Sequence, residues 1–388
     1  MKMLCVFGTR PEAIKFAPII KRLREDKFFQ TTVCTTSQHL EMLNQVLTVF
    51  NIPRDFDLKV MRYDQSLTYS TTQILSGFDD VLQQVKPDWV LVQGDATSAF
   101  AAALAAYYSH VNIGHIEAGL RTWDKHAPFP EEFNRRAIAV IADANFAPTS
   151  VARQNLVREG ISEDRIWVTG NTGIDALFLM LKRFEENPAL VSEIQQRFAF
   201  LSRKKRLVLV TAHRRESFGD KFEEICSALR DIAVSSDDAQ LVYPVHLNPN
   251  ALRTVEKVFG AIHIGESLTA PLDNLFLTEP LDYASMVYLL RSAHIVLTDS
   301  GGLQEEAPTL GKPVLVMRDV TERPEGVTAG VAKVIGRSRQ SITSATIELL
   351  KNSNEYTKMA RPVNLYGDGH SAEKVLQILR SLSQPKTN

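Results

Sequence analysis

The feature that most constrains this chain is a repeated alternation between short apolar runs and longer segments with helical spacing. Runs such as residues 89–92 (WVLV) and 207–210 (LVLV) are apolar throughout. Strands of this kind are buried on both faces, as in a parallel sheet covered by helices on its two sides. The alternation therefore predicts an α/β protein built from βαβ units. The predicted strands are residues 3–7, 31–35, 89–93, 112–116, 144–147, 166–169, 206–211, 240–244, 274–277, 295–298 and 314–317.

These strands fall into two groups, with a boundary near residues 170–173 and a charged helical stretch after it. A chain of 388 residues is long enough for two domains. We expect two doubly wound, Rossmann-like domains, residues 1–170 and 171–370, with a cleft between them. A last helix is expected over residues 371–383.

Composition excludes several classes of protein. The net charge is −1 and there is no basic stripe, so a nucleic-acid surface is not expected. No apolar stretch approaches the roughly 18 residues of a membrane span, and the apolar start of the chain is too short for a signal peptide. The three scattered cysteines, Cys5, Cys34 and Cys226, fit a reducing cytoplasm and lack partners at metal-ligand spacing.

One predicted strand runs directly into a glycine-rich loop, residues 299–306 (DSGGLQEE). Paired glycines let backbone approach a ligand, and a helix start favours a phosphate. Glu305 and Glu306 could bond ribose hydroxyls. Because the loop is neither G-x-G-x-x-G nor a P-loop, it predicts a nucleotide diphosphate held without NAD. An ordinary turn with a capping serine is equally consistent with the loop taken alone.

The first strand is followed by residues 8–15 (GTRPEAIK), in which Pro11 suits the first helical turn. Arg10 and Lys15 then lie at a helix start, where cations oppose the helix dipole unless an anion is present. They are interpreted as a phosphate clamp, with surface cations on a solvated turn as the alternative.

Three carboxylates in the first half follow predicted strands or begin a helix: Asp95, Glu117 and Glu131. Acids at neighbouring strand ends converge and repel, so at least one is expected to have a raised pKa and to serve as an acid. Each alone could instead be a helix cap or an ion-pair partner.

Two histidines follow strands in the second half. His213, in residues 211–217 (TAHRRES), is placed to bind or protonate a leaving phosphate. His246 repeats the pattern, although a lone histidine is more often structural. Arg318 and Arg323 follow the strand after the glycine loop and are candidates for anion or interdomain contacts.

Taken together, the motifs resemble the non-hydrolysing UDP-N-acetylglucosamine 2-epimerases. The resemblance implies a two-domain GT-B-type fold, a substrate in the interdomain cleft, a homodimer, and a last helix that packs back on the first domain. It is carried by residues 7–15, 94–97, 115–122, 130–135, 170–177, 211–217, 243–249 and 299–329.

The resemblance also implies a reaction. UDP-N-acetylglucosamine is inverted at C2 by elimination and re-addition of UDP through 2-acetamidoglucal, with no cofactor. The product, UDP-N-acetylmannosamine, supplies surface polysaccharides.

Site roles follow from the same resemblance. Asp95, Glu117 and Glu131 form the acid/base set, and which of them removes the C2 proton stays open. The resemblance also implies that His213 assists the departure of UDP, that Arg10 contacts the diphosphate and that Lys15 pairs with the acids. Ser300, Gly301 and Gly302 would bind the phosphates, and Glu306 the ribose. The uracil would lie near Phe276, and His246 would contact the substrate.

Three departures from the family pattern stand out. Residues 265–273 look like an insertion that alters the uracil loop or bulges into solvent, and Gly173 replaces a larger apolar residue near the boundary. Gln38 and His39 match a second, activating substrate site, but the arginine that normally follows is Leu40. Activation by substrate is still expected.

Three other functions fit parts of the sequence: a UDP-sugar glycosyltransferase, a hydrolysing epimerase and a non-catalytic nucleotide-sugar sensor. The sequence does not fix the sugar either, because a related branch acts on more heavily modified UDP-sugars.

Overall fold

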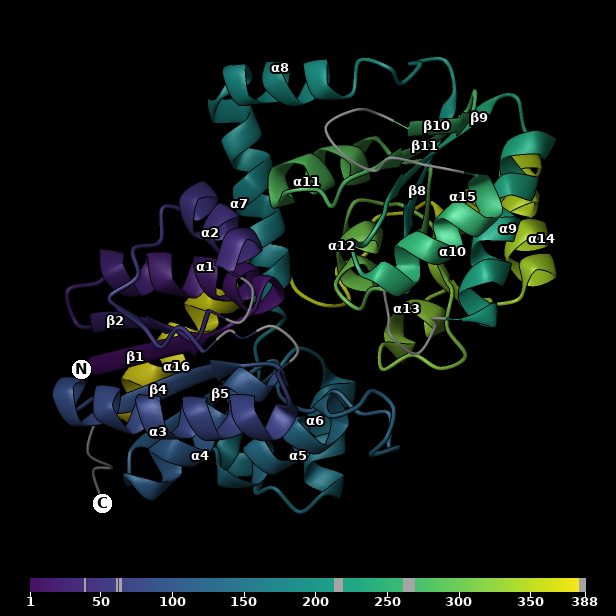
Figure 1. Ribbon diagram of the computed structural model, residues 1–388. Helices are drawn as coiled ribbons and strands as arrows, with labels where there is room; N and C mark the ends of the chain where they lie inside the picture. The colour runs from purple at the N-terminus through teal and green to yellow at the C-terminus, as the bar shows by residue number, and fades with distance from the viewer. Residues whose placement is uncertain (38–39, 61, 63–64, 213–218, 261–268, 384–388) are drawn as a thin grey trace. The chain divides into compact units, whose positions relative to one another are not determined.

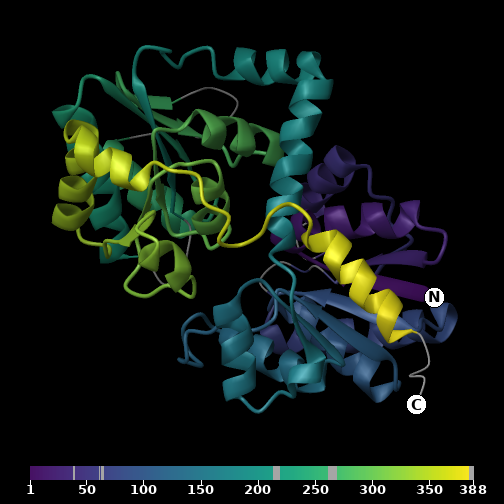
Figure 2. The same cartoon turned by 180° about the vertical axis from the view of Figure 1, so that it is seen from behind.

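The computed structural model describes residues 1–37, 40–60, 62, 65–212, 219–260 and 269–383. Its contacts divide the chain into two compact units, which we call unit 1 (Met1–Leu179 with Tyr366–Asn388) and unit 2 (Met180–Leu365). Each contains a sheet of seven strands covered by helices (Figures 1 and 2), which confirms the α/β class with two Rossmann-like units.

The sheet of unit 1 is parallel throughout, with strand order β3-β2-β1-β4-β5-β6-β7. The strand order reverses direction between β1 and β4, the place where doubly wound sheets bind ligands. The two-residue strand β3 was not predicted, because so short a segment carries no apolar run. The strands are β1 Lys2–Phe7, β2 Gln30–Thr35, β3 Phe56–Asp57, β4 Trp89–Gln93, β5 Asn112–Ile116, β6 Ala144–Ala147 and β7 Ile166–Val168.

Helices cover both faces of this sheet. One core joins β1, β2 and β4 to α1, α2 and α16, and a second joins β1, β4 and β5 to α3, α4 and α5. The C-terminal helix thus packs within unit 1, beside α1 (Figure 2). The helices are α1 Arg10–Glu25, α2 Leu40–Phe50, α3 Leu67–Val85, α4 Thr97–Tyr108, α5 Glu131–Ile141, α6 Ser150–Arg158, the short η1 Glu163–Arg165, α7 Thr172–Glu186, which continues into unit 2, and α16 Ser371–Leu382.

Unit 2 repeats the design with strand order β10-β11-β9-β8-β12-β13-β14, and its order reverses between β8 and β12. All its pairings are parallel except that β10 is antiparallel to β11. The strands are β8 Arg206–Thr211, β9 Ala239–Pro244, β10 Thr269–Leu272, β11 Leu275–Thr278, β12 Ile295–Thr298, β13 Val314–Val316 and β14 Ala332–Val334.

The antiparallel edge strand β10 lies inside the segment interpreted as an insertion, residues 265–273. Residues 269–272 of that segment do not bulge into solvent, because they pair with β11, the strand of Phe276. Strands β10 and β14 were not predicted, since short edge strands carry little periodic signal.

The core of unit 2 forms between its sheet and α9, α10 and α14, while α11 and α12 contact β8 and β12. The helices are α8 Pro188–Arg197, α9 Asp220–Ser235, α10 Pro249–Phe259, α11 Tyr283–Ser292, α12 Leu303–Thr309, α13 Pro324–Thr328, α14 Arg339–Lys351 and α15 Ser353–Met359. Among the described residues, no helix is long and apolar enough to cross a membrane.

The boundary between the units differs from the predicted break at residue 170. Residues 171–179 and 366–370 belong to unit 1. The physical reason is a set of buried contacts within that unit: the Asn171 amide donates to the Tyr366 carbonyl at 2.5 Å, and the Asp175 carboxylate accepts the Ala372 amide at 2.8 Å.

Candidate active site

In unit 1 the most constrained polar residue is Glu117, directly after β5. Its φ is +64°, a conformation that non-glycine residues rarely adopt and that costs roughly 1–3 kcal/mol. The Gly94 amide, after the neighbouring strand β4, donates to the Ile116 carbonyl at 2.9 Å. Strained backbone of this kind is concentrated at functional sites, where surrounding contacts hold it in place.

Donors to the Glu117 carboxylate come from α1, from β4 and from the segment before α7. The Lys15 ammonium, on α1, lies 2.6 and 2.7 Å from its two oxygens. The Asn171 side-chain amide donates to Oε1 at 2.8 Å, and the Gln93 amide, at the end of β4, donates to Oε2. Gln93 and Asn171 are not among the site residues that the sequence predicts. Gln93 ends a predicted strand, and Asn171 lies at the predicted domain boundary, within the motif of residues 170–177.

Asp95 follows β4 and therefore lies at a strand end beside that of Glu117. Its side chain is 32% exposed, and its Oδ2 lies 3.0 Å from Nη2 of Arg135 on α5. The Asn134 side-chain amide donates to the Asp95 backbone carbonyl at 2.9 Å. These contacts bring the start of α5 to Asp95.

Glu131 is the first residue of α5 and is partly buried. Its neighbour Glu132 has a different role, because it is fully buried and accepts the amides of Thr122 and Trp123, each at 3.1 Å. Of the two adjacent glutamates, Glu132 therefore holds a loop, and Glu131 stays the candidate for chemistry.

Two further buried groups shape this end of the sheet. Glu12 accepts the amides of Gly8 (3.0 Å) and Thr9 (2.8 Å) and the Ser98 hydroxyl (2.8 Å), and burial raises the pKa of its carboxyl. His115 donates from Nε2 to the Gly94 carbonyl at 2.7 Å, and burial lowers its pKa to about 4. A neutral His115 is thus a fixed donor that orients the loop before Asp95.

In unit 2 the predicted strand, glycine turn and helix are present as β12, residues 299–302 and α12. The Ser300 amide donates to the Thr298 hydroxyl at 2.9 Å, and that hydroxyl lies 2.6 Å from the Thr211 hydroxyl at the end of β8. A Cβ on Gly301 would lie 2.6 Å from Nη1 of Arg323, whereas one on Gly302 would meet nothing within 4 Å. Close approach to a side chain of the protein is thus one reason for a glycine at 301.

A buried ionic network lies behind the loop. Arg323 donates to Glu305 at 2.5 Å and to Glu322 at 2.6 Å, and Arg318 donates to Glu322 at 2.7 Å. Arg318 and Arg323 therefore make ion pairs inside unit 2. Glu305 is bound to Arg323, whereas Glu306, the candidate for a ribose contact, accepts the Tyr283 hydroxyl at 3.4 Å.

The other predicted site residues are located as follows. Arg10 begins α1 and is partly buried; His246 is exposed, with its Nδ1 accepting the Asn248 amide at 3.1 Å. Phe276 is buried in β11, with its ring 4.8 Å from that of Phe200. His213, Gln38 and His39 lie outside the described residues.

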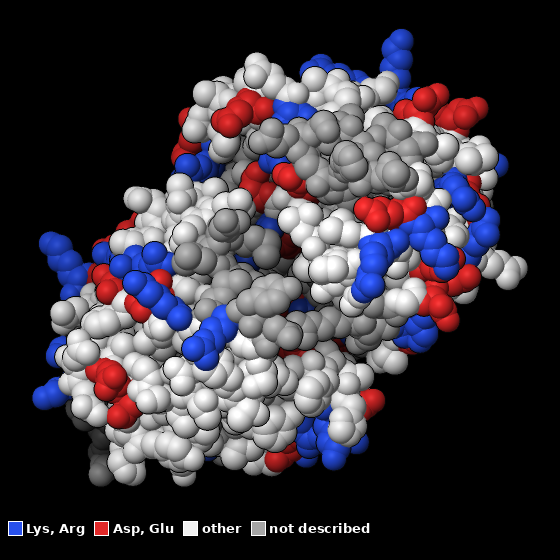
Figure 3. Space-filling view, in the orientation of Figure 1, with Lys and Arg blue, Asp and Glu red and all other residues white. Residues whose placement is uncertain are grey.

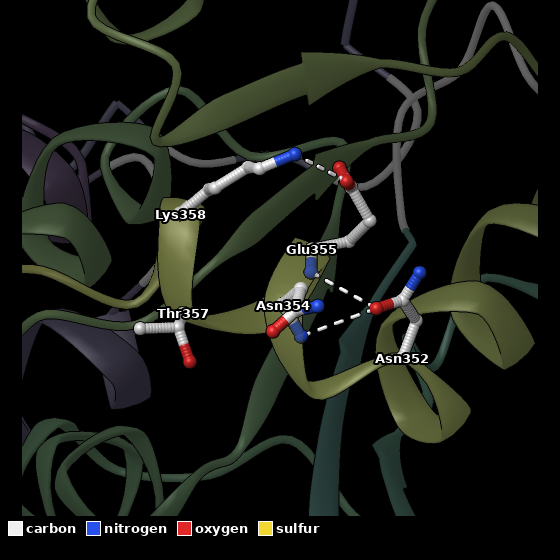
Figure 4. A pocket seen from close by; sticks show the side chains of 5 residues that line it. All are labelled: Asn352, Asn354, Glu355, Thr357 and Lys358. Atoms are coloured by element: carbon white, nitrogen blue, oxygen red, sulfur yellow. Dashed lines mark hydrogen bonds and ion pairs between the residues drawn. The ribbon is translucent and has the colours of Figure 1, made fainter.

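A surface hollow around α15 is not part of this site (Figure 4). It is lined by Asn352, whose side chain caps the helix, and by the Lys358–Glu355 ion pair. The ring of His294, just before β12, stacks on Tyr356 of α15 at 3.9 Å, so the hollow lies at the strand starts, opposite the glycine loop. Among the described residues, no group of three metal-ligating side chains could hold a metal ion.

Comparison with known proteins agrees with the resemblance. A family model described as UDP-N-acetylglucosamine 2-epimerase matches residues 21–380. The UDP-N-acetylglucosamine 2-epimerase of Salmonella typhimurium is 50% identical over 381 residues, covering 98% of this chain and 99% of the relative.

Two solved structures extend the match to the fold. The UDP-GlcNAc 2-epimerase of Neisseria meningitidis bound to UDP-GlcNAc has a TM-score of 0.93 at 44% identity, covering 98% of this chain and 100% of the other. The enzyme of Methanocaldococcus jannaschii, in complex with UDP-GlcNAc and UDP, has a TM-score of 0.83 at 31% identity, with 98% and 100% covered. The chain belongs to the UDP-N-acetylglucosamine 2-epimerase family of isomerases.

Proposed function

We propose that this protein converts UDP-N-acetylglucosamine reversibly into UDP-N-acetylmannosamine without hydrolysing either sugar nucleotide. The observation that carries the proposal is the strained, buried Glu117, whose carboxylate is paired with Lys15 at a strand end, in a member of this family. Relatives solved with UDP-GlcNAc bound support the substrate.

The chemistry must avoid a bare carbanion, because the C2 proton has no adjacent carbonyl to acidify it. A base removes this proton while the C1–O bond breaks. The C–H electron pair forms the C1=C2 double bond of 2-acetamidoglucal, and UDP leaves with the C–O pair. UDP then adds back at C1 while a proton is delivered to the other face of C2, so no oxidant or reductant is needed.

Two faces of C2 require two proton-handling groups, and unit 1 offers carboxylates in unlike environments. Glu117 is buried against Lys15, whereas Asp95 is partly exposed and contacts Arg135. Unlike surroundings let one carboxyl act as base while another acts as acid. We assign proton transfer to Asp95, Glu117 and Glu131, without choosing which of them removes the proton.

UDP binding is assigned mainly to unit 2. The backbone of residues 300–302 would bind the diphosphate, Glu306 the ribose, and the strand of Phe276 the uracil. Arg10, His213 and His246 are the further proposed substrate contacts, with His213 assisting the departure of UDP. A loop held by paired charges suits a ligand that must be retained while the sugar is detached.

We also propose a homodimer that buries the α4–α5 face of unit 1. Helix α4 has no charged residue, and Tyr108 at its end is 64% exposed. On α5, Phe133 and Val140 are exposed seven residues apart, on one side of the helix. The region of Figure 3 where Figure 1 labels α3 and α4 carries few charged side chains. A Val140→Asp change is expected to give monomers in sedimentation, whereas the matched change at exposed Val234 on α9 leaves the dimer intact.

The cellular setting belongs to the proposal as well. The protein would act in the cytoplasm and supply UDP-N-acetylmannosamine for surface polysaccharide synthesis. A second substrate molecule would activate it at a site that includes Gln38 and His39; hyperbolic rather than sigmoidal kinetics in a substrate titration would count against this.

One experiment tests the main proposal: incubation with UDP-N-acetylglucosamine alone in D₂O, followed by NMR. We expect an equilibrium of the two sugar nucleotides with deuterium at C2. Free N-acetylmannosamine would indicate a hydrolysing enzyme, no change would indicate a sensor, and turnover only with an added acceptor would indicate a glycosyltransferase.

A further inference from the structure

Two covalent connections join the units, and the segment that leads into the first lies beside the end of the second. Helix α7 leaves unit 1 between Leu179 and Met180, and the chain returns between Leu365 and Tyr366 (Figure 2). Asn171 lies just before α7 and contacts the returning segment as well. These two connections are the covalent attachments of unit 2 to unit 1.

Asn171 is 1% exposed and bonds in three directions. Its amide donates to the Tyr366 carbonyl at 2.5 Å, and its Oδ1 accepts the Gly173 amide, in the first turn of α7, at 3.0 Å. Its Nδ2 donates to Oε1 of Glu117 at 2.8 Å. One buried side chain therefore links the outgoing helix, the returning segment and a carboxylate of the candidate active site.

The junction around Asn171 is tightly packed. Gly170 has φ +91°, and a Cβ there would lie 2.5 Å from the Ser371 hydroxyl and 3.1 Å from Cα of Gly367. A Cβ on Gly367 would lie 3.4 Å from backbone atoms of Asn171. Closely packed segments transmit displacements to their neighbours instead of absorbing them.

The other donors to Glu117 do not share this connection. Lys15 lies on α1 and Gln93 ends β4, both held by the sheet of unit 1. Titratable groups that face Glu117 include Lys15, from α1, and His115, from its own strand. Asn171 thus differs from Lys15 and Gln93 in being attached to both connections.

We propose that Asn171 is a positioning residue that couples the arrangement of both inter-unit connections to the orientation of the Glu117 carboxylate. The inference rests on the proposed function, since it concerns a carboxylate assigned to proton transfer. It gives the acid/base group a direct link to the segments through which unit 2 is attached.

The test compares Asn171→Ala and Asn171→Asp with Asp175→Ala. Asp175→Ala loosens the same junction, by removing the acceptor of the Ala372 amide, without touching Glu117. Asn171→Asp keeps the shape and the acceptor for Gly173 but removes the donor, so it serves where the alanine variant fails to fold. We expect both Asn171 variants to lower kcat by about 10- to 100-fold, the scale of a misplaced catalytic group, with KM changed much less.

The pH profile separates positioning from a merely structural role. Losing a hydrogen bond to the charged form of Glu117 moves one limb of the kcat profile to higher pH, further for Asn171→Asp, while Asp175→Ala leaves both limbs in place. Unmoved limbs in the Asn171 variants, or the same shift in Asp175→Ala, would overturn the proposal.

A second readout does not depend on turnover. Carboxyl ¹³C NMR titration of Glu117, assigned by its loss in Glu117→Gln, should move to higher pH in the Asn171 variants. If the wild type does not epimerise UDP-N-acetylglucosamine, the proposed function fails while this titration still decides the role of Asn171. An unchanged titration overturns the role itself.

Discussion

The two units place different chemistry at the carboxyl ends of their central strands. In unit 1, the strand ends beside the β1–β4 reversal present Glu117 to donors from α1, β4 and the segment before α7. In unit 2, the reversal between β8 and β12 presents the backbone of residues 299–302. Behind this loop, Arg323 forms ion pairs with Glu305 and Glu322. The first arrangement suits proton transfer and the second suits holding an anion.

The difference shows that the sheet topology fixes where a ligand site forms, whereas the residue types at that site fix its chemistry. Doubly wound sheets open a crevice wherever the strand order reverses. A carboxylate beside that crevice, with cation and amide donors around it, becomes an acid/base candidate. Glycines in that place, packed against the buried Arg323 guanidinium, expose backbone amides that can bind an anion.

The largest expected effect comes from removing the charge in unit 1. Glu117→Gln and Asp95→Asn should each lower kcat by roughly a hundredfold or more, because a positioned acid/base group contributes on that scale. Calorimetry should find UDP binding little changed, since the nucleotide is assigned to unit 2. Near-normal turnover in both variants would remove these residues from the mechanism and end the proposed division of labour.

The pH dependence of stability offers a second test of the contrast. Burial lowers the pKa of His115 from 6.5 to about 4. Between these two pH values the residue is neutral in the folded protein but protonated in the unfolded chain. Its contribution is present above pH 6.5 and is lost as the pH falls toward 4, by roughly 2–3 kcal/mol at pH 4.5.

Urea unfolding at pH 7.5 and 4.5 measures this loss, which should largely vanish in His115→Gln. His294 of unit 2 also has a lowered pKa, of about 4, but it is only half buried, so solvent screens it and His294→Gln should recover less. An equal recovery in the two variants would contradict the greater constraint assigned to the unit 1 site.

A matched pair of glycines tests the packing of the unit 2 loop. Gly301→Ala should lower the free energy of unfolding by about 1–3 kcal/mol, because its Cβ would overlap the buried Arg323 guanidinium. Gly302→Ala should change it by less than about 0.5 kcal/mol, since its φ is −61° and the space beyond it is open. Chemical denaturation of both variants is the measurement, and equal losses would show that Arg323 yields freely.

The smallest effect is expected at Gly173 in unit 1, where the sequence departs from the family. A Cβ there would lie 3.5 Å from Oδ1 of Asn171 and 3.7 Å from Cγ of Lys15, both ordinary contacts. Gly173→Ala should therefore stabilise α7 by about 0.5–1 kcal/mol. A loss of stability would mean that the junction at Asn171 has no room even for one methyl group.

The sequence by itself determined the α/β class, the positions of the buried strands, and the polar residues that follow them. Those signals are local: an apolar run, a glycine pair and a proline in a first helical turn depend on neighbouring residues only. The short edge strands β3, β10 and β14 carry too little of such a signal. The boundary at residue 170 was displaced because a turn pattern does not say which sheet its flanking residues pack on.

Only the tertiary structure decided which strand ends lie side by side and which side chains meet there. Lys15 reaches Glu117 across 102 positions in the chain, and Asn171 reaches it across 54. Of the two adjacent glutamates, it is Glu132 that is fully buried and accepts two backbone amides. Contacts of this kind depend on strand order and on the exact path of loops, which local periodicity does not encode, because hydrogen-bonding partners are chosen by proximity in space and not by spacing along the chain.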